Sequence, residues 1–174
     1  NVAFGKDALE NATTSSYNTA VGFKSLEANT TGGSNTAVGS LALDANTSAD
    51  GNVAIGVNAA SATTTGNSNT AVGQNAALLN TTGTYNVVVG GHAFDANTTG
   101  SYNTAIGGNA LTTATTASNN VALGYAALGL NTTGTQNTSL GSYTLDANTT
   151  ADANTAVGYQ ALSANTTGTQ NTAV

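Results

Sequence analysis

The stretch Asn154-Thr-Ala-Val-Gly-Tyr-Gln-Ala-Leu-Ser-Ala-Asn-Thr-Thr-Gly-Thr-Gln170 is one complete copy of a 17-residue repeat. Its opening motif, Asn-(Thr/Val)-Ala-(Val/Ile/Leu/Phe)-Gly, returns every 17 residues without an insertion or deletion. A fixed short period implies that each copy stacks on the one before it, because any change of length would break the stack. The ten copies begin at residues 1, 18, 35, 52, 69, 86, 103, 120, 137 and 154, and residues 171–174 begin another.

We number the positions of each copy from 1 to 17, starting at the motif Asn. Positions 1 to 5 predict a short strand that ends at a glycine, since β-branched residues suit a strand and Gly permits a tight backbone after it. Position 8 is mostly Ala and position 9 mostly Leu, which predicts a second short strand. Asn-Thr-Thr-Gly at positions 12 to 15 predicts a turn. A helical repeat is disfavoured, because 17 residues cannot hold two helices and their turns.

The fold predicted is therefore an all-β parallel β-solenoid, or β-roll, with 17 residues per coil and about ten coils. At ~4.8 Å per coil, the rod would be roughly 48 Å long. Residues 1–174 form a single repeat array. We expect it to be an excerpt of a longer array, because neither end carries the atypical capping copy that solenoids normally need.

Stacking turns each position of the copy into a column along the rod. We expect the aliphatic columns at positions 4 and 9 to fill the interior and the small Ala at position 3 to form a flat outer face. The Asn at position 1 would form a ladder in which each amide bonds to the amides above and below, and the Thr at position 13 a second ladder. The residues predicted for these structural columns include Asn18, Asn35, Asn69, Asn103 and Asn154; Gly22, Gly39 and Gly73; Val21, Val38 and Val72; Leu26 and Leu43; and Thr30 and Thr81.

Asn154 to Leu162 resembles the Ser-Val-Ala-Ile-Gly-x-x-Ala repeats in the head domains of YadA-like trimeric autotransporter adhesins. It is also similar to the Asn-Thr-Ala-Val-Gly repeats of phage tail-fibre-like and bacterial surface proteins. The resemblance covers all ten copies and implies a left-handed parallel β-roll, usually with three chains side by side, displayed outside the cell. Adhesin head repeats are about three residues shorter, and the extra residues of this chain would fall in Ala-Asn-Thr-Thr.

Composition argues against several classes of partner. The net charge is −6 and Lys6 and Lys24 are the only cationic side chains, apart from a histidine. Nucleic acids and anionic membranes are bound through Lys and Arg, so we expect neither as a partner. No apolar run approaches the roughly 20 residues that span a bilayer, so we expect no membrane insertion in this segment.

Few residues point to catalysis, and we expect neither an enzyme nor a cofactor or metal. His92 is the only histidine and sits at the variable position 7, with no recurring nucleophile or carboxylate beside it. Glu10, Glu27 and Asp44 share position 10 in consecutive copies, where neighbours would repel each other or share a cation. Other residues interrupt that column, which favours a solvated acidic edge.

Two surface features leave alternatives open. Asn-x-Ser/Thr sequons recur, mostly at position 12, and would be either glycosylation acceptors or plain turn chemistry. They lie at Asn11, Asn29, Asn46, Asn80, Asn97, Asn131, Asn137, Asn148 and Asn165. Tyrosines recur at position 17 (Tyr17, Tyr85, Tyr102) and at position 6 (Tyr125, Tyr159), where they would stack on sugars or on another surface.

The function we expect is that of a structural segment of an extracellular fibre, filament or surface adhesin. The chain would be a stiff rod whose partner is itself, as a homotrimer or as an end-to-end or lateral filament. The alternative is a β-solenoid surface that binds ice or a glycan. Against ice binding, the adjacent Thr at positions 13 and 14 would face opposite ways on a strand.

Overall fold

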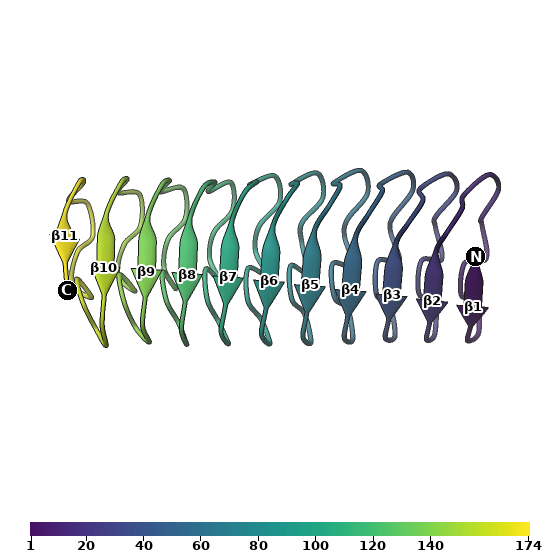
Figure 1. Ribbon diagram of the computed structural model, residues 1–174, viewed down its shortest axis with the longest axis horizontal. Helices are drawn as coiled ribbons and strands as arrows, with labels where there is room; N and C mark the ends of the chain where they lie inside the picture. The colour runs from purple at the N-terminus through teal and green to yellow at the C-terminus, as the bar shows by residue number, and fades with distance from the viewer.

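The computed structural model describes all residues, 1–174, as a straight rod of stacked coils without a helix (Figure 1). Each coil contributes one short strand, and the eleven strands form a single parallel sheet in chain order. The two ends of the chain lie at opposite ends of the rod. The predicted all-β parallel solenoid is therefore confirmed. The strands are β1 (Val2–Phe4), β2 (Thr19–Val21), β3 (Thr36–Val38), β4 (Val53–Ile55), β5 (Thr70–Val72), β6 (Val87–Val89), β7 (Thr104–Ile106), β8 (Val121–Leu123), β9 (Thr138–Leu140), β10 (Thr155–Val157) and β11 (Thr172–Ala173).

The register pairs each residue with its equivalent in the next coil. Thr19 pairs with Thr36, and Val21 with Val38, and the same offset holds along the whole sheet. Each strand ends at the glycine of position 5, whose φ is 136° at Gly22, 142° at Gly39 and 134° at Gly73. L-residues other than Gly rarely adopt such a backbone, which explains why position 5 is always Gly.

Positions 8 and 9 do not form the second strand that the sequence predicts. Ala42 and Leu43 at these positions are both fully buried, whereas neighbouring residues of a strand point to opposite faces. The backbone is left-handed at positions 7 and 9, with φ of 58° at Leu41 and 51° at Leu43. The Ala42 N–H donates to Gly39 O and the Asn46 N–H to Leu43 O, at 3.4 and 3.1 Å, so the segment is a series of tight turns. The prediction was wrong because a short apolar run suits a buried turn as well as a strand.

Backbone hydrogen bonds between coils nevertheless continue around the turns. The Leu26 N–H donates to Ala42 O at 3.0 Å, and the Thr30 N–H donates to Thr47 O at 3.0 Å. Both acceptors lie in the following coil. Each coil is thus tied to the next along the turns as well as along the sheet, and all these bonds run along the rod.

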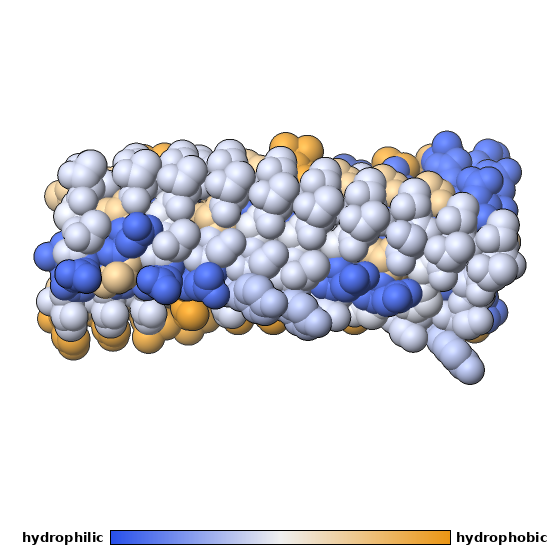
Figure 2. Space-filling model, turned by 90° about the horizontal axis from the view of Figure 1, so that it is seen from above, coloured by the Kyte–Doolittle hydropathy of each residue, from blue (hydrophilic) through white to orange (hydrophobic).

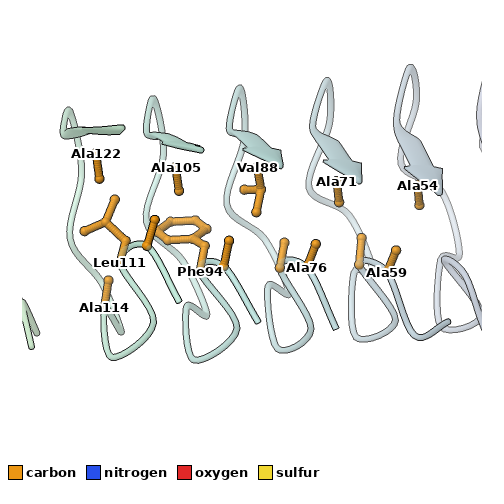
Figure 3. Close-up of a cluster of buried hydrophobic side chains, with 14 of the residues drawn as sticks. Ala54, Ala59, Ala71, Ala76, Val88, Phe94, Ala105, Leu111, Ala114 and Ala122 are labelled. Carbon is orange, nitrogen blue, oxygen red and sulfur yellow. The ribbon is translucent and has the colours of Figure 1, made fainter. Parts of the chain in front are cut away.

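The apolar interior is narrow and consists of positions 3, 8 and 9, together with Ala114 and Ala117 in the seventh coil. In the middle of the rod, the position 3 side chains point from the strands toward those of positions 8 and 9 on the opposite wall (Figure 3). Leu26 and Leu43 at position 9 are fully buried, as expected for an interior column. The fully buried position 3 residues include Ala20, Ala37, Ala54, Ala71, Ala105, Ala122 and Ala156.

The prediction that position 4 fills the interior is wrong. Val38, Ile55 and Leu123 are 36%, 41% and 45% exposed, and Val21 and Val72 are partly exposed. Positions 2 and 4 point outward, and the small Ala of position 3, expected on the outer face, points inward. The reason is space: Leu side chains enter the interior from position 9 of the turns, which leaves room for only a small side chain on most of the facing strands. Val88 on β6 is the one larger buried residue at position 3.

Candidate binding surfaces

The position 1 asparagines form a buried polar column beside the apolar interior. Asn35 Oδ1 accepts the Asn52 N–H at 2.9 Å, and Asn35 Nδ2 donates to Ala49 O in its own coil at 2.8 Å. The side chain thus links two coils and also braces its own coil. The Oδ1 atoms of Asn18, Asn69, Asn103 and Asn154 accept the equivalent N–H of the next coil.

The ladder differs in one detail from the expected amide-to-amide chain. Its regular link is a backbone N–H to a side-chain oxygen, and direct amide-to-amide bonds occur only from Asn86 onward. The Asn86 Nδ2 donates to Asn69 Oδ1 at 3.1 Å, and the Asn103 Nδ2 donates to Asn86 Oδ1 at 3.1 Å.

A second column of buried amides occupies position 12. The Asn46 Nδ2 donates to Asn29 Oδ1 at 2.9 Å and to Ala49 O at 3.2 Å. Sequence reasoning placed these residues on an accessible turn. The signal for burial was that only Ala and Thr replace Asn at position 12. The fully or almost fully buried members are Asn29, Asn46, Asn80, Asn97, Asn131 and Asn148.

This burial decides between the two interpretations of the sequons. N-glycosylation needs an accessible Asn side chain, whereas the column at position 12 lies inside the folded rod. Asn137, at position 1, is also fully buried. Asn11 is exposed and Asn165 is partly exposed, both in terminal coils. For the other sequons, the turn interpretation holds in the folded chain.

The threonines at positions 13 and 14 form regular columns on one polar side of the rod (Figure 2). The Thr30 Oγ1 donates to Thr47 O at 3.0 Å, and the Thr81 Oγ1 donates to Thr98 O at 2.8 Å. The position 13 hydroxyls are therefore used between coils. Position 14 is solvent-exposed, as at Thr65.

The outer face of the sheet is the most regular apolar surface of the molecule. Position 2 supplies Thr or Val and position 4 supplies Val, Ile, Leu or Phe on every strand. Figure 2 shows orange, hydrophobic atoms gathered along the lower edge, where the sheet of Figure 1 lies. The exposed hydrophobic members are Val2, Phe4, Val38, Ile55, Val87, Val89, Val121, Leu123 and Val174.

Acidic side chains gather in the first two coils. Carboxylate oxygens of Asp7, Glu10 and Glu27 lie within 4.8 Å of one another. Lys6 Nζ lies 2.6 Å from Asp7 Oδ2, and Lys24 Nζ lies 2.9 Å from Glu27 Oε1. The hydrogen bond to Glu27, and then its charge, raise the pKa of Lys24. Both lysines of the chain therefore compensate this acidic edge.

The later acids of position 10 find hydroxyl partners one coil further on. Asp44 Oδ1 accepts the Ser61 hydroxyl at 2.6 Å, and Asp95 Oδ1 accepts the Thr112 hydroxyl at 2.9 Å. His92 is exposed, with Nδ1 3.3 Å from Asp95 Oδ2. The structure thus places a carboxylate beside His92, which the sequence pattern did not indicate.

The exposed tyrosines form two separate groups, and within each group the rings contact one another. The rings of Tyr85 and Tyr102 stack, with centroids 5.3 Å apart and an angle of 7° between their planes. Tyr125, Tyr143 and Tyr159 pack edge to face, with centroid distances of 5.4 and 6.3 Å. Sequence reasoning missed Tyr143, because it occupies position 7 and not position 6.

A depression of about 360 Å³ lies beside Tyr143. It exists because Gly129 places no side chain at position 10 and Ala126 only a methyl group at position 7 of the same coil. Its signal in the sequence was two gaps in columns that carry larger residues in neighbouring coils. The remaining walls are Asn109, Thr112, Leu130, Tyr143 and Asp146.

The comparisons with known proteins identify no relative. No family model, curated protein or solved structure matches this chain. The structure also contains no helix with the length and apolar character needed to cross a membrane.

Proposed function

We propose that this chain is a structural segment of an extracellular fibre, filament or surface adhesin, and that it acts as a stiff rod which associates with copies of itself. The observation that carries the proposal is the outer face of the sheet. Eleven parallel strands in register present two straight columns of Thr or Val and of larger aliphatic residues.

Stiffness follows from the hydrogen bonding. Bonds along the rod come from the sheet, from the turns and from the asparagine and threonine columns, so bending the rod at any coil would strain several of them together. Self-association follows from the apolar columns, because covering exposed aliphatic side chains removes them from water. A like face on a second copy matches their spacing, since both faces repeat once per coil.

Mass measurement in solution tests the self-association. We expect the wild-type rod to be oligomeric by sedimentation and to appear as multi-chain rods or filaments in electron micrographs. The triple variant Ile55→Lys, Val89→Lys and Leu123→Lys places three like charges on the sheet face and should be monomeric. A wild-type chain that is monomeric at all concentrations would rule the proposal out.

A matched control separates this effect from added charge alone. Thr65, Thr99 and Thr133 occupy the exposed position 14 in the same three coils. The triple variant Thr65→Lys, Thr99→Lys and Thr133→Lys adds the same charge on the polar side and should associate like the wild type.

The same sheet face favours ice binding as a second candidate function. The sequence-based objection concerned positions 13 and 14, whereas positions 2 and 4 share one flat outer face with a hydroxyl and methyl groups on most strands. Under this alternative, a monomeric wild type would show thermal hysteresis in an osmometer, and Thr70→Lys on β5 would reduce it. An absence of thermal hysteresis would exclude this candidate.

A further inference from the structure

The depression at Ala126 and Gly129 is lined by polar side chains that differ in whether they have hydrogen-bond partners. The Thr112 hydroxyl donates to Asp95 at 2.9 Å, and the Asn109 amide donates to the Tyr125 hydroxyl at 3.3 Å. Each of these two side chains thus donates one hydrogen bond within the rod.

Asp146 is the wall residue with a buried polar atom that lacks a partner. Its Oδ1 atom is buried and has no hydrogen-bond partner. At the two equivalent places along the rod, Asp44 and Asp95, the hydroxyl of the following coil donates to Oδ1. Ser163 follows Asp146 at the same position without making this bond. The carboxylate is therefore under-compensated at the edge of the depression, and a positive charge beside it would be favourable.

The other walls present mainly carbon to a ligand. Ala126 and Leu130 supply aliphatic surface, and Tyr143 supplies an aromatic ring that is 37% exposed. A cation at the end of an alkyl chain is matched by all three features: carbon walls, an aromatic ring and a carboxylate.

The charge of the molecule favours the same ligand. The net charge is −6, and Lys6 and Lys24 lie in the first two coils, at the opposite end of the rod from Asp146. A positively charged ligand therefore approaches an anionic surface at this end.

We propose that the depression between Asn109 and Asp146 binds a primary ammonium group on a short alkyl chain, as presented by an exposed lysine of a partner protein. The alkyl chain lies against Ala126 and Leu130, and the ammonium group lies beside the Asp146 carboxylate and the Tyr143 ring. This proposal does not depend on the rod being part of a fibre, because it concerns one site in the seventh to ninth coils.

Nuclear magnetic resonance titration tests the proposal, with Nα-acetyl-L-lysine amide as the probe. We expect saturable shifts of the backbone amide signals of Gly129 and Asp146, with a Kd on the order of millimolar for so small and open a site. Nα-acetyl-L-norleucine amide keeps the alkyl chain but lacks the ammonium group, and it should bind at least tenfold more weakly. Equal binding of the two probes, or no saturable shift with the lysine probe, would overturn the proposal.

Three variants locate the binding. Asp146→Asn removes the negative charge with little change of shape. Gly129→Thr fills the depression with the residue that the preceding coil carries at this position, Thr112. Tyr143→Ala removes the aromatic ring and leaves the same residue that the preceding coil has at position 7, Ala126. Each should weaken binding of the lysine probe at least tenfold while leaving the circular dichroism spectrum unchanged.

Tyr102→Ala is the matched control, since Tyr102 is an exposed ring remote from the depression and is stacked on Tyr85. Its affinity for the probe should stay within twofold of the wild type. If Asp146→Asn or Gly129→Thr binds the probe as well as the wild type, the binding lies elsewhere and the proposed site is wrong.

Discussion

At the scale of single residues, this rod depends on buried amides as much as on aliphatic side chains. Each coil is so thin that its interior holds a few side chains only, and two of them are usually Asn, at positions 1 and 12. A buried amide costs free energy unless its polar atoms are paired. The position 1 amide meets this condition by bonding both to its own coil and to the next, which explains why no other residue occurs there.

Asn86→Ala measures the value of one such amide. In the wild type, Asn86 Oδ1 accepts the Asn103 N–H at 2.9 Å, and the substitution removes this acceptor. It also removes the hydrogen bonds that Asn86 Nδ2 donates to Gly100 O at 2.9 Å and to Asn69 Oδ1 at 3.1 Å. We expect a loss of about 2–4 kcal/mol in the free energy of unfolding, measured by denaturant titration.

Asn67→Ala serves as the comparison. Asn67 is exposed and accepts one hydrogen bond, from the Asp50 N–H at 2.7 Å. Its loss should cost less than about 1 kcal/mol. Similar costs for the two variants would mean that the buried column is not a main source of stability.

At the scale of elements, each coil is one short strand followed by a long series of tight turns. The strand has three residues, which is too few to be stable alone, and it persists because parallel neighbours flank it on both sides. The left-handed residues at positions 7, 9 and 17 then fold the remaining chain back to the start of the next coil. The glycine between strand and turns is where the two conformations meet.

Substitutions at the adjacent Gly107 and Gly108 test whether a glycine is needed for its backbone conformation or only because it lacks a side chain. Gly107 has φ of 133°, and a Cβ there would run into the backbone of Gly124 in the next coil. A Cβ on Gly108 would lie 3.4 Å from the Tyr125 ring, in ordinary contact. We expect Gly107→Ala to cost more than about 3 kcal/mol and Gly108→Ala less than about 1 kcal/mol.

Thermal unfolding followed by circular dichroism gives both values under the same conditions. A Gly107→Ala variant that melts at the wild-type temperature would show that position 5 tolerates a side chain. The invariance of this glycine would then need another cause than its backbone.

At the scale of the whole molecule, stability is a sum over coils and their contacts with neighbours. Contacts link each strand only to the strand before and the strand after it. The length of the rod can therefore change by whole coils, whereas the length of a coil cannot change without breaking the columns.

Two deletions test this distinction. Removing residues 86–102 takes out one whole coil and joins Tyr85 to Asn103, so that every column continues. We expect a folded rod that is one coil shorter and somewhat less stable. Removing Thr98 alone shifts every later residue of that coil by one position, and the columns at positions 13 to 17 no longer match their neighbours.

Hydrogen exchange distinguishes the two results. The whole-coil deletion should keep protected amides along the entire rod. The single deletion should lose protection in the sixth coil and the coils beside it. Equal protection in both variants would contradict the requirement for a constant coil length.

Some features of the candidate sites could be predicted from the sequence, and others could not. The fixed period predicted the sheet and the columns along it, because every coil contributes an equivalent residue, but it did not predict which columns face outward. The depression beside Tyr143 arises where the pattern fails, at Ala126 and Gly129, and a missing side chain shows its effect only when the neighbouring coils are in place. The burial of Asn46 and its equivalents was missed for a related reason: Asn is a common turn residue, and its side chain points inward only because the turn curls around it.

By itself, the amino-acid sequence determined the length of the coil, the parallel in-register stacking and the membership of each column, because a period of 17 residues without insertions admits one way of placing like beside like. The tertiary structure decided which side of the strand faces inward. Alternation along a strand assigns positions 2 and 4 to one face and position 3 to the other, and it treats the two faces alike. Only the opposite wall breaks this symmetry, since the turns that place Leu43 and its equivalents inside leave a space that a small side chain fills on most strands and that holds a Val only at Val88.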